Sequence, residues 1–296
     1  MKIFFSAVCR VVLPAVALAS LALLPFSATA QQKKPAAPNS VRLYILDCGD
    51  ITGVGEVQFG FKPGQLADTR MVTPCYLIVH PRGTMMWDTG EVSDADFKGN
   101  PTKQGAFTIT RPLLPQLAAL GYTPADITYL ALSHYHGDHV ANANAFAGST
   151  WIVQDVEKAA MFAKQDGKAK APGTAPDVTL YGKLEKSKTI LLHSEDHDVF
   201  GDGTVVIKFT PGHTPGHQSL FLKFAKTGPV VLSGDLYHYP EERSLGIVPG
   251  FDVNADQTRK SRADLEAFMK KSGAVLWIQH ATADNAKLKK APEYYE

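Results

Sequence analysis

Short hydrophobic runs, separated by turn-forming Gly, Pro, Asn and Asp residues, recur along the chain after residue 40. Runs of this length, bounded by turn signals, predict β-strands rather than helices. The predicted strands are 41–48, 74–80, 84–87, 127–132, 150–154, 189–193, 204–210, 218–224, 229–232 and 274–279.

Amphipathic segments with a helical period alternate with these strands. The predicted helices are 112–120, a helix beginning at 141–146, 156–162, and a long helix opened by Asp256 and ended by Gly273. Residues 91–110 are polar, Gly-containing and too long for a simple connection, so we expect a lid or binding loop there. Two strand-rich halves, each finished by helices, predict an α/β fold of two face-to-face sheets with helices outside, in one domain spanning 41–296.

The N-terminus has a different pattern. Lys2 and Arg10 precede the apolar stretch 11–26, which is followed by an A-x-A site ending at Ala30. This layout is typical of a secretory signal peptide. The alternative is an uncleaved membrane anchor, but the stretch is short for a span and polar residues follow it. We therefore expect residues 1–30 to be removed, residues 31–40 to be a flexible lead-in, and the mature protein to be periplasmic or secreted without membrane attachment.

Composition describes an ordinary globular protein with enough chain for a sizeable core: 296 residues, 45% hydrophobic, with a formal net charge of +1. The near-neutral balance gives no electrostatic signal for nucleic acid as a partner. After cleavage Cys48 and Cys75 remain. An exported protein could pair them, but a buried thiol fits each strand-like run as well, so we favour two separate thiols.

The candidate chemistry lies in the run from Ser133 to His139, which places His134, His136, Asp138 and His139 in the loop after the predicted strand 127–132. Imidazole nitrogen and carboxylate oxygen are the ligands that zinc and similar divalent metals prefer. Polar side chains directly after a buried strand are costly unless they bind something. The run therefore predicts metal chemistry.

Three further candidates, His213, Asp235 and His280, each follow a predicted strand, with Gly or Pro nearby to permit a sharp turn. Loops at one edge of a sheet bring distant segments to one site. Other interpretations stay open here, because Asp235 could be a turn former and His280 could simply end a strand. His217, four residues after His213, is a rival to it.

The motif HxHxDH with this downstream trio resembles the metallo-β-lactamase superfamily. That resemblance implies an αββα sandwich and two metal ions, zinc or other divalent metals, with Asp235 bridging them. The ligands it implies for one ion are His134, His136 and His213. Those it implies for the other are Asp138, His139 and His280.

Within the superfamily the chain is most similar to the N-acyl-homoserine lactonases. The matching segments are residues 43–49, 74–78, 87–90, 120–124 and 210–219. Those lactonases place a substrate-contacting Tyr three residues after the bridging Asp, where this chain has His238, preceded by Tyr237.

The resemblance implies a dinuclear zinc hydrolase, in which a metal-bridging hydroxide opens the lactone ring. Asp138 is then the expected proton shuttle, and Tyr237 or His238 the group that stabilises the oxyanion. Asp88 is expected to orient a metal-binding loop.

Other functions remain in competition with this one. Another hydrolase of the same fold would act on a phosphotriester, a carboxylester or a β-lactam, and a non-catalytic zinc-binding protein would turn nothing over. A full bridging set with Asp138 favours an enzyme, because structural zinc sites are usually closed at four ligands. The expected partner is a small-molecule lactone or ester, and a homodimer is left open.

Overall fold

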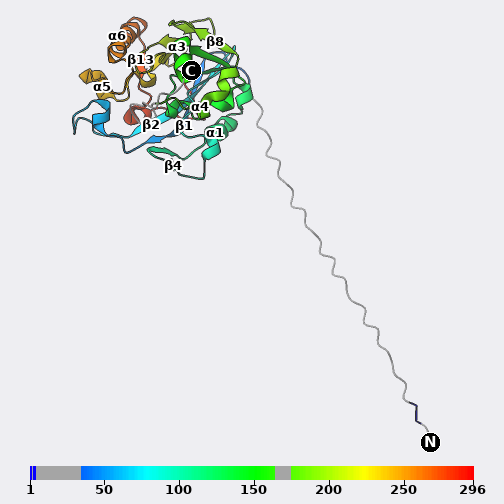
Figure 1. Ribbon diagram of the computed structural model, residues 1–296. Helices are drawn as coiled ribbons and strands as arrows, with labels where there is room; N and C mark the ends of the chain where they lie inside the picture. Colours follow the sequence, from blue (N-terminus) through cyan, green and yellow to red (C-terminus); the bar gives the residue numbers. More distant parts are fainter. Residues whose placement is uncertain (2, 5–34, 164–174) are drawn as a thin grey trace. The chain divides into compact units, whose positions relative to one another are not determined.

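The computed structural model describes residues 1, 3–4, 35–163 and 175–296 (Figure 1). The predicted signal peptide, apart from three of its residues, and the lead-in before residue 35 lie outside the described residues. Within the described ranges, no helix is long and apolar enough to cross a membrane.

The first sheet has eight strands in the order β4-β5-β1-β2-β3-β6-β7-β8. Its strands β1, β2 and β3 pair antiparallel, whereas β3, β6, β7 and β8 pair parallel. The strands are β1 (Arg42–Ile51), β2 (Met71–His80), β3 (Gly83–Trp87), β4 (Thr102–Gln104), β5 (Phe107–Ile109), β6 (Tyr129–Ala131), β7 (Thr150–Gln154) and β8 (Thr189–Leu192).

The second sheet has five strands in the order β13-β12-β11-β10-β9. Strands β9 to β12 pair antiparallel and β13 is parallel to β12. The strands are β9 (His197–Asp198), β10 (Val205–Phe209), β11 (Gln218–Phe224), β12 (Gly228–Leu232) and β13 (Val275–Trp277).

Alternation of side chains along the strands builds separate hydrophobic layers. On β2, Tyr76 and Ile78 belong to the core between the two sheets, whereas Leu77 belongs to a second core under the helices that cover the first sheet. A third core joins the second sheet to α6 (Ala255–Ser272) through residues such as Leu265 and Met269. Figure 1 shows α6 beside β13, with α1 and α4 on the other side of the domain. The predicted αββα sandwich is confirmed.

Some predicted elements differ from the structure in detail. The helix predicted to begin at 141–146 is a short 3-10 turn over Ala143–Phe146. The long helix α6 is capped by Asn254, whose side chain accepts a hydrogen bond from the Gln257 amide, and not by Asp256. The segment 91–110, expected to be a lid or binding loop, contains a 3-10 turn (Asp94–Asp96) and then the β4–β5 hairpin, and β5 joins the first sheet by pairing Asp50 with Thr108. The shorter helices are α1 (Leu113–Ala119), α2 (Gly137–Val140), α3 (Asp155–Met161), α4 (Val178–Tyr181), α5 (Pro240–Leu245) and α7 (Thr282–Asn285).

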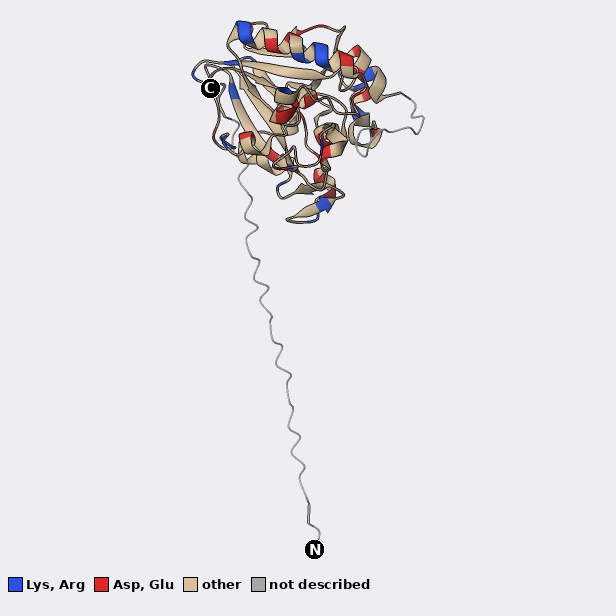
Figure 2. Ribbon diagram, turned by 90° about the vertical axis from the view of Figure 1, so that its left-hand side faces the viewer, with Lys and Arg blue, Asp and Glu red and all other residues tan. Residues whose placement is uncertain are grey.

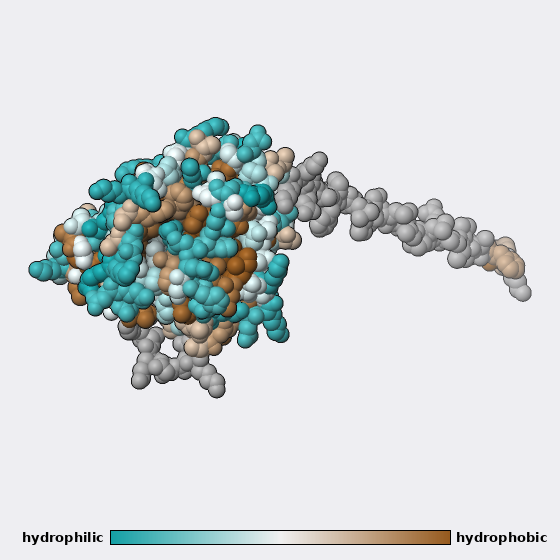
Figure 3. Space-filling model, turned by 90° about the horizontal axis from the view of Figure 1, so that it is seen from above, coloured by the Kyte–Doolittle hydropathy of each residue, from teal (hydrophilic) through white to brown (hydrophobic). Residues whose placement is uncertain are grey.

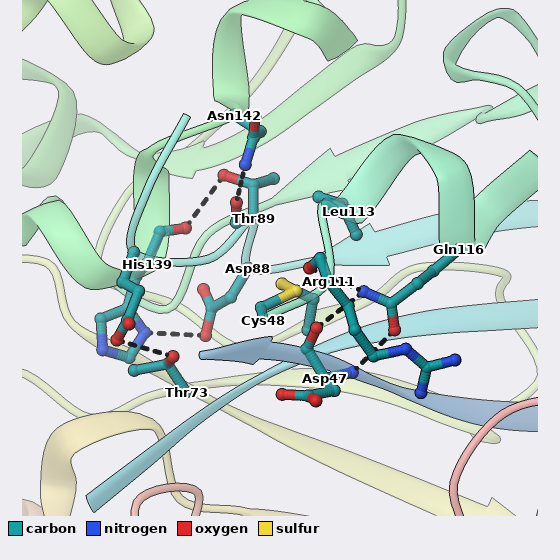
Figure 4. The surroundings of a disulfide bond; sticks show 12 residues. Asp47, Cys48, Thr73, Asp88, Thr89, Arg111, Leu113, Gln116, His139 and Asn142 are labelled. Carbon is teal, nitrogen blue, oxygen red and sulfur yellow. Dashed lines mark hydrogen bonds and ion pairs between the residues drawn. A yellow bond between two sulfur atoms is a disulfide. The ribbon is translucent and has the colours of Figure 1, made fainter. Parts of the chain in front are cut away.

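The expectation of two separate thiols is wrong, because Cys48 and Cys75 form a disulfide between β1 and β2, with their Cα atoms 5.8 Å apart (Figure 4). The two strands are antiparallel neighbours, and their register places Leu46 opposite Cys75 just before an irregularity in β1. The pairing of β1 with β2 brings the two cysteines to this distance, and that pairing cannot be inferred from the positions of the cysteines in the sequence. The bond packs against Gly90, where an added Cβ would lie 2.9 Å from the Cys48 Cβ.

The surface mixes charge and polarity without large segregation in the views shown. Figure 2 shows basic and acidic residues interspersed along α6. In the face seen in Figure 3, hydrophobic residues surface only in patches between hydrophilic ones. The exposed large apolar side chains include Val57, Leu245 and Val275.

Candidate metal centre

The fold brings all seven predicted ligand residues to one edge of the sandwich. The motif follows β6, so His134 and His136 lie in the loop and Asp138 and His139 lie in the first turn of α2. From the second sheet, His213 follows β10, Asp235 follows β12 and His280 follows β13. Their ligand atoms form two groups, each with all atoms within 4.8 Å of one another. The groups are His134, His136, His213 and Asp235, and Asp138, His139, Asp235 and His280.

Three of these imidazoles are oriented by a hydrogen bond from the ring nitrogen that faces away from the cluster. The pairs are His139 Nδ1 with Asp88 Oδ2 at 3.0 Å, His213 Nδ1 with Asp252 Oδ1 at 2.8 Å, and His280 Nδ1 with the Val72 carbonyl at 2.8 Å. Each partner is an acceptor, so Nδ1 carries a proton and Nε2 is the ring nitrogen left for a metal ion. Outer partners of this kind fix the tautomer of a metal-binding imidazole.

The inward nitrogens face one another at distances that suit a shared cation. His139 Nε2 lies 3.2 Å from His280 Nε2, and His213 Nε2 lies 3.0 Å from His136 Nδ1. When the His139 and His280 rings are both neutral and protonated at Nδ1, their Nε2 lone pairs repel each other unless a positive charge lies between them. Within the described residues, the buried atoms His134 Nε2 and Asp235 Oδ1 have no hydrogen-bond partner. These donor atoms therefore fit divalent metal ions.

Asp235 contacts both groups with different oxygens. Its Oδ2 lies 3.3 Å from His213 Nε2, and its Oδ1 lies 3.1 Å from His139 Nε2 and 3.0 Å from His280 Nε2. A carboxylate placed this way can bind two metal ions at once. Burial would raise the pKa of Asp235, but the surrounding histidines, His139 first among them, hold it well below its usual range. Asp235 is therefore ready to bind cations.

His217 packs closely against the backbone of Gly234 and Asp235. The Asp235 amide donates to His217 Nε2 at 2.9 Å, and His217 Nδ1 lies 3.0 Å from the Thr210 hydroxyl. Gly234 has a φ of +55°, and a Cβ there would lie 2.6 Å from His217 Nε2. His217 thus supports the turn that presents Asp235, whereas its rival His213 is the one that joins the ligand cluster.

Asp88 connects the end of β3 to the motif, as the sequence suggested. Its Oδ1 accepts from the Ser133 amide at 2.6 Å while its Oδ2 faces His139 (Figure 4). The residue has a φ of +56°, which is uncommon outside glycine and marks a backbone held in place by its surroundings. Asp88 therefore orients both the loop and one of its imidazoles.

Gln279 is a supporting residue that sequence reasoning missed. It is buried next to His280, and its Oε1 accepts from Trp87 Nε1 and from the Gly234 amide, each at 3.0 Å. Its Nε2 donates to Asp88 Oδ2 at 2.9 Å. One amide side chain thereby joins both sheets behind the metal ligands. No motif marks it, because a glutamine at the end of a strand has no local signature.

Glu157 is a second missed residue. It is buried on α3 and accepts from the Tyr135 amide at 3.0 Å, the Thr214 hydroxyl at 2.9 Å and the Gly216 amide at 2.7 Å. It therefore ties the motif loop to the loop that carries His213. Burial raises the pKa of Glu157 to about 7, although these hydrogen bonds oppose the shift.

A cavity of about 330 Å³ opens onto the ligand cluster. Its walls come from the segment 51–59, the turn of the β4–β5 hairpin and the loop before α6, so the predicted 91–110 segment does border the site. Within the described residues, no Lys or Arg lines it. The apolar lining includes Ile51, Val54, Phe59, Met71, Phe107 and Phe251, and the ligand side of the cavity has His136, Asp138, Asp235 and His280.

Tyr237 and His238 have different positions, which sequence could not separate. The Tyr237 hydroxyl donates to Glu266 Oε1 at 3.3 Å and is absent from the described cavity lining, so the structure does not bring it to the site. His238 lines the cavity, but its Nε2 faces Asp235 Oδ2 and its Nδ1 faces Glu242 Oε1, each at 3.1 Å. Neither residue has a free donor for a substrate carbonyl in this arrangement.

Comparisons with known proteins agree with this geometry. Residues 68–280 match the metallo-beta-lactamase superfamily. The chain is 31% identical to N-acyl homoserine lactonase AttM of Rhizobium radiobacter and 27% identical to N-acyl homoserine lactonase AiiA of Bacillus thuringiensis subsp. kurstaki. Each alignment covers 86% of this chain and 98% of the relative. A solved N-acyl homoserine lactone hydrolase with the product N-hexanoyl-L-homoserine at its catalytic metal centre is 25% identical, with a TM-score of 0.70 over 86% of this chain and 99% of that one.

Proposed function

The chain belongs to the metallo-beta-lactamase superfamily and is a hydrolase, and from that premise we propose that it opens the lactone ring of N-acyl-homoserine lactones with two zinc ions bound at the candidate centre. The observation that carries this proposal is the pair of ligand groups that share Asp235, set in an apolar cavity. The lactonases to which the chain is similar over most of its length support the same substrate class.

The lining of the cavity favours a neutral, partly apolar substrate. Without a Lys or Arg among the described lining residues, the cavity offers no ammonium or guanidinium group for the carboxylate of a β-lactam. Its apolar walls, formed by residues such as Phe59 and Phe107, suit an acyl chain. These features favour a lactone over a β-lactam inside the same fold.

The two zinc ions, when bound, would supply Lewis acidity and a water of lowered pKa. In the reaction, water adds to the lactone carbonyl carbon, the bond from that carbon to the ring oxygen breaks, and the leaving alkoxide takes up a proton. Asp138 is the proposed proton carrier, because its side chain lines the cavity while its Oδ2 lies 3.4 Å from His139 Nε2 and 3.5 Å from His280 Nε2. Burial would raise the pKa of Asp138, but the neighbouring His139 and His280 side chains lower it, so the group is ionised at neutral pH.

The test is hydrolysis of a panel by purified protein of known zinc content: short- and long-chain acyl-homoserine lactones, an aryl ester, a phosphotriester and a β-lactam. Chelator-sensitive turnover of the homoserine lactones above all others is the expected result. Preferred turnover of the phosphotriester or the β-lactam would refute the substrate. Asp138→Asn is expected to lose about 10²–10⁴ in kcat with zinc retained, and an active Asp138→Asn variant would refute its role.

We also propose that the protein is exported with cleavage after Ala30. The N-terminal pattern supports this, and so does the Cys48–Cys75 disulfide, since such bonds persist in oxidising compartments. Mass spectrometry of the protein from the periplasm or medium should give a mature chain beginning at Gln31. An intact N-terminus in the cytoplasm would refute export.

A further inference from the structure

A buried chain of charged side chains runs from α6 to the candidate bridging carboxylate. Arg262 Nη2 donates to Glu242 Oε2 at 2.7 Å, and Glu242 Oε1 lies 3.1 Å from His238 Nδ1. His238 Nε2 then lies 3.1 Å from Asp235 Oδ2. The side chains of all four residues are less than a tenth exposed.

Glu242 and Arg262 also make hydrogen bonds to the backbone at and around His238. Glu242 Oε2 also accepts from the His238 backbone amide at 3.2 Å, so the carboxylate holds both the ring and the backbone of His238. Arg262 donates from Nε to the Leu236 carbonyl and from Nη1 to the Ile247 carbonyl. These carbonyls lie on both sides of His238 in the sequence, so Arg262 fixes the segment that presents it.

Burying four ionisable groups is expensive and does not by itself stabilise a fold, because desolvation offsets much of the attraction. A role in docking α5 onto α6 does not require them either. The same two helices are also joined by Arg243 and Glu266, a partly exposed pair at 2.6 Å in which Glu266 also accepts from the Tyr237 hydroxyl. The buried chain differs in its endpoint, which is an oxygen of Asp235.

We propose that Glu242 and Arg262 are positioning residues for the metal centre, which hold His238 against Asp235 Oδ2 and thereby fix the orientation of the carboxylate shared by the two ligand groups. This inference rests on the metal centre of the proposed function but not on its substrate. It assigns His238 to Asp235 instead of to the substrate carbonyl, in agreement with the absence of a free ring nitrogen on that residue.

The experiment measures zinc affinity of the full mature chain by competition with a chromophoric chelator. Glu242→Gln and His238→Phe are each expected to weaken zinc binding by about 10–100-fold, the usual effect of removing an outer partner of a metal ligand. If Glu242 acts through His238, the double variant should bind zinc no more weakly than His238→Phe alone. Arg243→Gln, which breaks the surface pair between the same helices, is the matched control and should bind zinc as the unaltered protein does.

Two outcomes would overturn the proposal: Glu242→Gln binding zinc as tightly as Arg243→Gln, or a double variant whose loss is the sum of the two single losses. Arg262→Lys keeps the charge but loses most of the guanidinium contacts, and it gives a milder test if Glu242→Gln does not fold. Its zinc affinity is expected to be lower than that of Arg243→Gln, and an affinity equal to that of Arg243→Gln would contradict the role of Arg262. Because zinc binding needs no substrate, a failure to hydrolyse lactones would leave this result intact.

Discussion

Glu157 gives the sharpest quantitative test of how the ligand loops are held. Replacing it by Gln keeps the size of the side chain but exchanges one acceptor oxygen for an NH₂ group. If the amide oxygen stays on Tyr135 and Thr214, the NH₂ group faces the Gly216 amide, and a buried donor loses its partner. An unsatisfied buried group of this kind costs about 1–3 kcal/mol.

The pH dependence of unfolding separates this loss from a general packing defect. Burial raises the pKa of Glu157 from 4.5 to about 7. The folded protein therefore keeps this proton between pH 4.5 and pH 7 while the unfolded chain releases it, and stability falls as pH rises through that window. The shift of about 2.5 units corresponds to about 3 kcal/mol lost by pH 8. Gln cannot ionise, so Glu157→Gln lacks this loss.

The expected result is that the stability deficit of Glu157→Gln, measured by urea unfolding, is largest at pH 5 and shrinks by about 2.5 kcal/mol by pH 8, which is enough to remove or reverse it. Comparing the two proteins at each pH cancels the titration of the groups they share. Glu185→Gln is the control, because that side chain is exposed, and its difference from the unaltered protein should stay flat. A deficit for Glu157→Gln that is constant from pH 5 to pH 8 would refute the reasoning.

Three further predictions follow from other parts of the fold. Gln279→Leu should lower the free energy of unfolding by about 2–6 kcal/mol, because the buried Trp87 indole and the Gly234 amide lose their acceptor. Urea unfolding checks this, and an unchanged midpoint would contradict it. Replacing Cys48 and Cys75 together by Ala should cost about 3–4 kcal/mol for a separation of 27 residues, whereas equal unfolding of both proteins under non-reducing conditions would argue against the bond. Burial raises the pKa of Glu91 to about 9, so the free energy of unfolding of the unaltered protein should fall relative to that of Glu91→Gln by about 1.4 kcal/mol per pH unit between pH 5 and pH 9. Thermal unfolding of both proteins across that range tests the slope, and parallel curves would refute it.

Local patterns in the sequence predicted the layers of the fold, and the resemblance to a known superfamily implied the gathering of the ligand residues. Strand 150–154 has the predicted limits, and His134 to His139 carry their own spacing. What the sequence could not predict depends on pairing between distant segments. The Cys48–Cys75 bond follows from the β1–β2 register, and the roles of Gln279, Glu157 and Glu242 follow from contacts across elements.

Tyr237 and His238 illustrate the same limit at single-residue scale. Adjacent residues in a turn point in different directions, and only the surroundings decide which one reaches the site. Arg262 stacks over the Tyr237 ring at 4.3 Å and Glu266 takes its hydroxyl, so the aromatic residue is held on the helix side. His238 is held on the cavity side by Glu242.

The split origin of the ligands has a thermodynamic consequence for anyone handling the protein. Four of them follow strand β6 of the first sheet and three follow strands of the second, so a bound ion links the two sheets. Any ion that binds only the folded chain stabilises it by mass action, by about 2.7 kcal/mol when its free concentration is 100 times its dissociation constant. The melting temperature of a preparation would then depend on the free metal concentration in its buffer as well as on its sequence. Variants of this protein can be ranked by stability only at a fixed, stated activity of free metal.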